Sequence, residues 1–218
     1  MNKFLFDGIE IEHICKPHLK NSYISISKDA KIVVKTPKVT KRFINNLLVE
    51  KQDWIKKQLL KFEQNQPIKI NLKDEVLLFG EIYSIDSNEV ESLKNSLQRL
   101  KKPTDENILK CYNNFYKLLG QVYLTTRLEY FSNIMNLDYS EIRYKKLKSR
   151  WGSCSSKKVI TLNTQLLKID KELIDYVVVH ELVHLVYMNH SKQFHNLVDY
   201  YLPNSKLIRK RLKDINLL

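Results

Sequence analysis

Two histidines four residues apart, inside a long apolar stretch near the C-terminus, constrain the fold of this chain more than any other feature. Residues 172–195 read ELIDYVVVHELVHLVYMNHSKQFH and hold four of the six histidines. The run VVV favours a strand locally, but positions four apart in a strand lie about 13 Å apart. On a helix they lie one turn apart on one face. The imidazoles of His180 and His184 can therefore share one ion only if this segment is helical.

Apolar residues occupy most sides of the predicted helix, which indicates that it is buried. Ionisable groups in apolar surroundings need a partner. A metal ion would satisfy both histidines, and a hydrogen-bonded histidine pair is the alternative. Glu181 lies about 100° around the helix from His180. It can reach a metal-bound water without being a ligand, which is the arrangement of a general base beside a Lewis acid.

A third metal ligand is expected at His190, six positions after His184. This is the metzincin-type spacing, and it requires the helix to end between the two histidines so that the chain folds back. Asn189 can take the left-handed conformation that such a turn needs. Ser191 can then cap the next helix.

A turn with the sequence SRWGSCSSKK joins two predicted strands, residues 141–148 and 159–166. Gly152 is expected to permit the turn. Arg150 and Ser153 offer hydrogen-bond donors where a developing oxyanion or a substrate phosphate would need them. A purely structural hairpin turn is the alternative.

Other polar residues near these motifs have two interpretations each. Asn163, on the returning strand, can hold a substrate backbone as an added strand or be an ordinary strand residue. His195 is interpreted as a surface or packing histidine paired with Asp199. Asp199 is ranked below His190 as a ligand. Cys154 can bind zinc in principle, but three histidines complete a catalytic set, so we expect it to be packing.

The N-terminal part is predicted to be rich in β-structure. The strongest hairpin signal is Asp7-Gly8 between two alternating runs. A second strand pair, YISIS and KIVVK around Lys28-Asp29-Ala30, extends this to a β-meander. Thr40 can cap one long helix over 41–64, and EVLLFGEIYSI reads as a hairpin bending at Gly80.

A domain boundary is predicted at Pro103, which ends the polar stretch 86–103. Thr104 begins the next helix, which is expected to run to about 135. The predicted fold class is thus α+β: residues 1–103 form a module of β-meander, long helix and hairpin, and residues 104–218 form the domain that carries the buried HExxH helix.

The net charge of +13 is compatible with a nucleic-acid partner, but compositional drift and solubility are the blander explanation. Basic residues cluster at 141–160 and 206–213. If the first cluster flanks the histidines, anionic substrates are favoured. Three distant cysteines fit a reducing, cytoplasmic environment. No window of ~20 apolar residues exists that could span a membrane, and the N-terminus does not read as a signal peptide.

The segments SRWGSCSSKKVITLNTQLL (149–167) and YVVVHELVHLVYMNHSKQF (176–194) resemble the YgjP-like metal-dependent hydrolases, often called YgjP-like metallopeptidases, which are relatives of the SprT and WLM zinc peptidases. The resemblance implies a zincin-like catalytic domain. It also implies one zinc ion held by His180, His184 and His190, with Glu181 as catalytic base. The chain departs from the family at His195, where a tryptophan usually follows the phenylalanine.

Three functions therefore remain in view. The first is a zinc metallopeptidase in which Glu181 activates a zinc-bound water to attack a peptide. The second is a metal-dependent hydrolase of an anionic small molecule such as a nucleoside triphosphate, a pyrophosphatase-type activity. The third is a nucleic-acid-associated protease.

Overall fold

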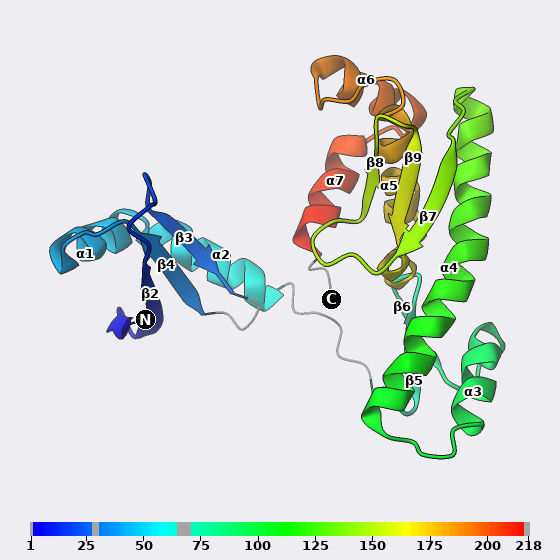
Figure 1. Ribbon diagram of the computed structural model, residues 1–218, viewed down its shortest axis with the longest axis horizontal. Helices are drawn as coiled ribbons and strands as arrows, with labels where there is room; N and C mark the ends of the chain where they lie inside the picture. The colour runs from blue at the N-terminus through cyan, green and yellow to red at the C-terminus, as the bar shows by residue number, and fades with distance from the viewer. Residues whose placement is uncertain (1, 28–30, 65–70, 216–218) are drawn as a thin grey trace. The chain divides into compact units, whose positions relative to one another are not determined.

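The computed structural model describes residues 2–27, 31–64 and 71–215, leaving out the side chains of 61–64 (Figure 1). The chain divides into two compact units, Met1–Gln66 and Pro67–Leu218. The boundary predicted at Pro103 is therefore wrong, and the predicted turn Lys28-Asp29-Ala30 lies outside the described residues. Among the described helices, none is both long and apolar enough to cross a membrane.

The first unit is built on a four-stranded sheet of β1 (Asn2–Phe6), β2 (Ile9–Cys15), β3 (Tyr23–Ile26) and β4 (Ile32–Thr36). Asp7 and Gly8 turn with positive φ angles of 49° and 76°, which confirms the first hairpin. The strand order is β1-β2-β4-β3, and β2 pairs with β4 in parallel. The predicted β-meander, which would pair β2 with β3, is wrong.

Burial explains this strand order. Ile32 and Val34 of β4 are fully buried, so the most apolar strand takes an interior position with a neighbour on each side. The more polar β3 takes the edge, where Tyr23 is exposed. Alternation along the sequence predicts the two strand pairs but does not specify which strands of the two pairs meet.

The long helix predicted over 41–64 is two helices, α1 (Lys41–Glu50) and α2 (Gln52–Gln64). Thr40 caps α1 as predicted, because its hydroxyl accepts the Phe43 N–H at 3.2 Å. No proline or glycine lies near the break at Lys51, so the sequence does not predict it. Side chains from both helices, among them Leu48 and Ile55, still pack into the same core under the sheet.

The second unit contains a hairpin, a three-stranded sheet and the remaining helices. In chain order these are β5 (Glu75–Leu78), β6 (Glu81–Ser84), η1 (Asn88–Val90), α3 (Glu91–Gln98), α4 (Asp105–Met135), β7 (Glu141–Lys145), β8 (Gly152–Cys154), β9 (Val159–Asn163), η2 (Thr164–Lys168), α5 (Lys171–Val183), α6 (Lys192–Tyr201) and α7 (Ser205–Asp214). The hairpin bends at Gly80 as predicted. The helix predicted from Thr104 is α4, capped by the Thr104 hydroxyl.

The segment before Pro103 belongs to this second unit because α4 holds it. The Tyr112 hydroxyl donates to the carbonyls of Leu72 and Glu75, at 3.0 and 2.9 Å, and the buried Tyr116 hydroxyl donates to the Leu77 carbonyl at 2.7 Å. Residues of β5, η1 and α3 also enter the same core as α4 and α5. Residues 86–103 are mostly polar, so the sequence does not indicate this packing, and helix α3 was not predicted.

The three-stranded sheet has the order β7-β9-β8. β7 pairs with β9 in parallel, and β8 pairs with β9 antiparallel. The segment predicted to be only a turn therefore contains strand β8, and β9 is not the antiparallel return of β7. Helix α5 contacts β8 and β9 on this sheet and also α4, α6 and α7 (Figure 1). This burial overrides the strand propensity of Val177, Val178 and Val179, all buried on α5.

We predict that Tyr116→Phe destabilises the second unit by about 1–3 kcal/mol, because it removes the donor from a buried carbonyl. Chemical denaturation, followed by circular dichroism, measures the free energy of unfolding. The control is Tyr200→Phe on α6, where the side chain is 76% exposed. Equal free energies of unfolding for the two variants would contradict the assignment of β5 to this unit.

Candidate metal centre and active site

Helix α5 ends before His190, as the spacing between His184 and His190 predicts. His180 and Glu181 lie in its last turn, and His184 is its C-cap residue. The chain then turns back through hydrogen bonds from the N–H groups of Val186 and Tyr187 to the Val183 carbonyl, at 3.0 and 2.9 Å.

The residues that bring His190 back are partly those predicted. Asn189 is not among the described residues with positive φ, so the predicted left-handed turn there is wrong. Ser191 caps α6 as predicted, because its hydroxyl accepts the Phe194 N–H at 3.3 Å. His190 thereby faces the last turn of α5.

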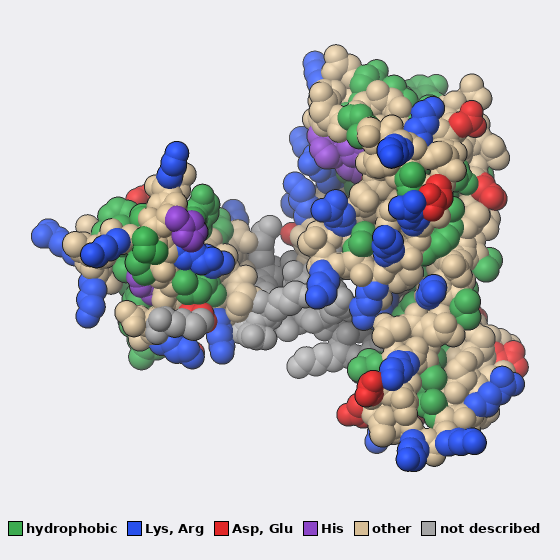
Figure 2. All heavy atoms as spheres, in the orientation of Figure 1, with side chains coloured by type: hydrophobic (Ala, Val, Ile, Leu, Met, Phe, Trp, Pro, Cys, Tyr) green, Lys and Arg blue, Asp and Glu red, His purple; other side chains and the backbone are tan. Residues whose placement is uncertain are grey.

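The three histidines predicted as ligands come together in space. Their candidate ligand atoms all lie within 4.8 Å of one another. The Nε2 atoms of His180 and His190 are 3.1 Å apart. His184 Nδ1 lies 3.0 Å from the Tyr187 carbonyl, which can only accept, so Nδ1 carries the proton and the Nε2 lone pair is free. The histidines of the second unit form the purple patch in Figure 2.

The donor set fits a divalent metal ion. Burial, followed by the neighbouring histidines, lowers the pKa of His180 to about 3, so its imidazole is neutral. Its buried Nδ1 has no hydrogen-bond partner among the described atoms. Its Nε2 faces the Nε2 atom of His190. The described chain therefore gives this buried ring few hydrogen-bond partners, which is unusual for a buried polar group. Three neutral imidazoles are a catalytic ligand set that leaves a fourth position for water or substrate.

Phe194, which was not among the predicted site residues, supports this cluster. Its ring is fully buried. Its centroid lies 4.8 Å from the ring of His180, 4.7 Å from that of His184 and 4.8 Å from that of His190. One phenylalanine therefore packs against all three candidate ligands and limits their orientations.

Glu181 is buried beside strand β8, with only 5% of its surface exposed. Burial raises the pKa of its carboxyl to about 8, and the nearby Arg150 acts in the opposite direction. A Cβ at Gly152 would lie 2.7 Å from Glu181 Oε1. Gly152 does not have a positive φ, so its predicted role in permitting a turn is wrong. It is the missing side chain that lets Glu181 lie against β8.

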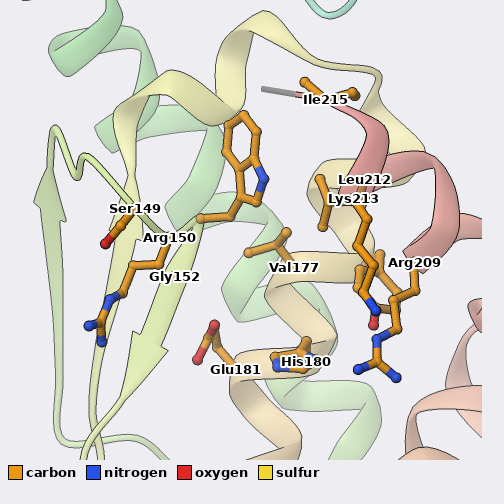
Figure 3. A pocket seen from close by; sticks show the side chains of 12 residues that line it. Ser149, Arg150, Gly152, Val177, His180, Glu181, Arg209, Leu212, Lys213 and Ile215 are labelled. Carbon is orange, nitrogen blue, oxygen red and sulfur yellow. The ribbon is translucent and has the colours of Figure 1, made fainter. Parts of the chain in front are cut away.

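A pocket of about 410 Å³ opens over these groups. Residues from the β7–β8 loop, β8, α5, α7 and the segment after α7 line it: Ser149, Arg150, Trp151, Gly152, Tyr176, Val177, His180, Glu181, Arg209, Leu212, Lys213 and Ile215. Figure 3 shows Glu181 and His180 together, with Arg150 on one side and Arg209 on the other. Ser153, predicted with Arg150 as a donor, is not among the lining residues.

The hydrogen bonds of Asn163 favour the second of its two interpretations, an ordinary residue at the end of a strand. Its amide nitrogen donates to the carbonyls of Leu147 and Arg150, both at 2.9 Å. Its amide oxygen accepts from the N–H groups of Leu147 and Gln165, at 3.3 and 3.1 Å. A fully buried amide with all these partners has no capacity left for a substrate. Its effect is to fix the loop that carries Arg150 at the pocket.

The predicted His195–Asp199 pair is also wrong. Asp199 accepts the Ser205 N–H at 3.1 Å, at the start of α7, and does not belong to the histidine cluster. His195 Nε2 accepts from Arg209 at 3.4 Å. Cys154 is outside the cluster as well, in agreement with its interpretation as packing, and burial raises the pKa of its thiol to about 11.

The fold and the histidine cluster define a chain of the metallopeptidase class. The family model of the YgjP-like metallopeptidase domain matches residues 20–215, so the chain belongs to the YgjP-like family. The resemblance noted in the sequence is thereby confirmed. The family implies a divalent metal, and the histidine cluster is its candidate site.

Two similar solved structures are crystal structures of metallopeptidase zymogens. Abylysin of Pyrococcus abyssi is 26% identical, over 44% of this chain and 99% of its own, with a TM-score of 0.39. Jannalysin of Methanocaldococcus jannaschii is 27% identical, over 41% of this chain and 91% of its own, with a TM-score of 0.37. A comparison with curated proteins gives no match.

We predict that His190→Ala loses most of the bound metal whereas His195→Ala retains it, because His190 lies in the cluster and His195 does not. Elemental analysis of the purified variants measures the metal per chain, with the unaltered protein as reference. Equal losses in both variants, or a loss only in His195→Ala, would overturn the choice of third ligand.

Proposed function

We propose that the protein is a zinc peptidase with a zincin-like catalytic domain and one zinc ion per chain. His180, His184 and His190 would hold the ion. The observation that carries the proposal is the convergence of three imidazoles, one of which lines a pocket together with the buried carboxyl of Glu181, in a chain of a metallopeptidase family. When bound, zinc supplies a Lewis acid that activates water and stabilises charge on the scissile carbonyl.

Glu181 is the general base in this proposal. Its carboxylate takes a proton from the attacking water and passes it to the leaving nitrogen. It does not belong to the ligand cluster, which supports a base rather than a ligand. Two neighbours set its position and charge. Gly152 leaves room for its side chain. The positive charge of Arg150 favours its ionised form, although burial is the larger influence and raises its pKa to about 8. A bound metal ion would add a second positive charge and extend the ionised, basic form to lower pH.

Hydrolysis of a nucleoside triphosphate is the second candidate, favoured by the basic residues that line the pocket: Arg150, Arg209 and Lys213. The same base and metal would act on a phosphoanhydride. The membership in a metallopeptidase family favours the peptide. Phosphate release from nucleotides, set against digestion of casein, separates the two. A nucleic-acid-associated peptidase would in addition bind DNA in a salt-dependent manner.

Glu181→Gln should fold and retain zinc but lose activity by a factor of ~100 or more, the range for general acid–base catalysis. The amide keeps the size of the side chain and removes the base. Peptide hydrolysis and zinc content are measured on the same preparation. If zinc is lost, Glu181 is a ligand, and if full activity remains, the site is a structural metal clip.

Gly152→Ala should lower activity about 10–100-fold at unchanged zinc content, because displacement of a catalytic group by about 1 Å has effects of this size. The new Cβ would meet the Glu181 side chain, at 2.7 Å from Oε1. Gly120→Ala in α4 is the matched control, since its Cβ would have no neighbour closer than 3.8 Å. Full activity in Gly152→Ala would show that Glu181 needs no such room.

A further inference from the structure

The basic cluster at 206–213, which lies on α7, contributes more residues to the pocket than the basic cluster at 141–160. Of the basic residues at 141–160, only Arg150 is among the lining residues, whereas Arg209 and Lys213 of α7 both are. Lys213 lies four residues after Arg209, hence on the same face of the helix. The blue side chains of Figure 2 surround the histidine patch.

No described carboxylate neutralises these two cations. Three other arginines of the second unit are paired: Arg127 with Asp175, Arg143 with Glu141, and Arg211 with Asp170 and Glu172. Arg99 and Arg150 form no ion pair with a described residue, and of these two only Arg150 lines the pocket. Neither Arg209 nor Lys213 forms an ion pair with a described residue. Among the described residues that line the pocket, Glu181 alone is acidic, and it is buried against β8. The α7 wall therefore carries a positive charge that the described part of the chain leaves unmatched.

Arg209 contacts the histidine cluster indirectly, through His195, whose ring stacks on one of the three candidate ligands. The ring of His195 stacks on the ring of His190, with centroids 6.2 Å apart. His195 Nε2 accepts from Arg209 Nη1 at 3.4 Å. This hydrogen bond orients the guanidinium but leaves its charge and most of its five N–H donors free. Figure 3 shows Arg209 on the same side of the pocket as His180.

Much of the rest of the pocket is apolar. Trp151, Val177, Leu212 and Ile215 line it, together with Ser149 and Tyr176. A side chain with an aliphatic stem and a terminal carboxylate matches an apolar pocket with a cationic edge. A guanidinium binds a carboxylate through two parallel hydrogen bonds. A triphosphate, which carries several charges, would find on this wall only one guanidinium and one exposed ammonium.

We propose that Arg209, supported by Lys213, binds a carboxylate of the peptide substrate, so that the preferred substrates have an acidic residue beside the scissile bond. The inference rests on the proposed peptidase function and names its substrate class. Arg209 is a specificity-determining residue in this proposal. His195 is a positioning residue that acts through Arg209.

Calorimetric titration of the zinc-loaded Glu181→Gln protein tests the proposal without turnover. The probes are octapeptides, acetylated and amidated, whose one charged side chain is a Glu that is moved along the peptide, each with a matched uncharged Gln peptide. Truncated Gln peptides with a free C-terminal carboxylate distinguish the side chain from the chain end as the source of the anion. At one or two positions the Glu peptide should bind about tenfold more tightly or better, the range of a charge-assisted hydrogen bond.

Adding Arg209→Gln should abolish this preference, while the matched control Lys210→Gln should keep it. Lys210 is the adjacent residue of α7 and does not line the pocket. Arg209→Glu should transfer the preference to a Lys peptide. Zinc content and far-UV circular dichroism confirm that the variants are folded.

The proposal is overturned by equal binding of all Glu and Gln peptides, by an equal loss in Lys210→Gln, or by an effect of Arg209→Gln on nucleoside triphosphate binding alone. Hydrolysis by the unaltered protein is measured separately. If the Glu preference depends on Arg209 but no peptide is cleaved, the subsite stands and the peptidase proposal fails. If Glu and Gln peptides are cleaved at equal kcat/KM, the subsite fails and the peptidase proposal stands.

Discussion

The burial of helix α5 is the constraint on which the rest of the second unit depends. The helix is surrounded by α4, α6, α7 and the strands β8 and β9, so its polar groups must function away from bulk water. That burial keeps the imidazole of His180 neutral and raises the pKa of Glu181. Each group would be an ordinary surface residue if α5 were exposed. The packing that stabilises the fold is thus also the source of the chemistry.

The elements that could be predicted from the sequence are those with a local signal. The capping residues Thr104 and Ser191 predict where α4 and α6 begin. If His180 and His184 share one ion, their spacing requires a helix, and α5 is one. What could not be predicted depends on contacts distant in sequence. The parallel pairing of β9 with β7, and the attachment of the β5–β6 hairpin to α4, follow from burial that no short segment encodes.

Single residues of the candidate site show the same difference between local signals, which could be predicted, and contacts distant in sequence, which could not. The three histidines could be named from spacing alone. The role of Gly152 could not, because a glycine in a turn-like sequence looks the same whether it provides a positive φ or room for a carboxylate. The sequence left Asn163 with two interpretations for a similar reason. A polar residue at a strand end can face a substrate or its own chain, and here its amide is fully used within the chain.

The three candidate ligands lie on one short stretch of chain, from the last turn of α5 to the start of α6, whereas the residues around Glu181 come from β8. Closing so short a loop costs little conformational entropy, so ion capture is a local event. Seating the carboxylate requires Glu181 to pack against Gly152, which lies 29 residues earlier in the sequence, and a contact of this longer range forms more slowly. If the three histidines hold an ion as proposed, a nascent or partly unfolded chain would bind it before Glu181 is in place, and the ion would then be a nucleus for folding of the catalytic unit.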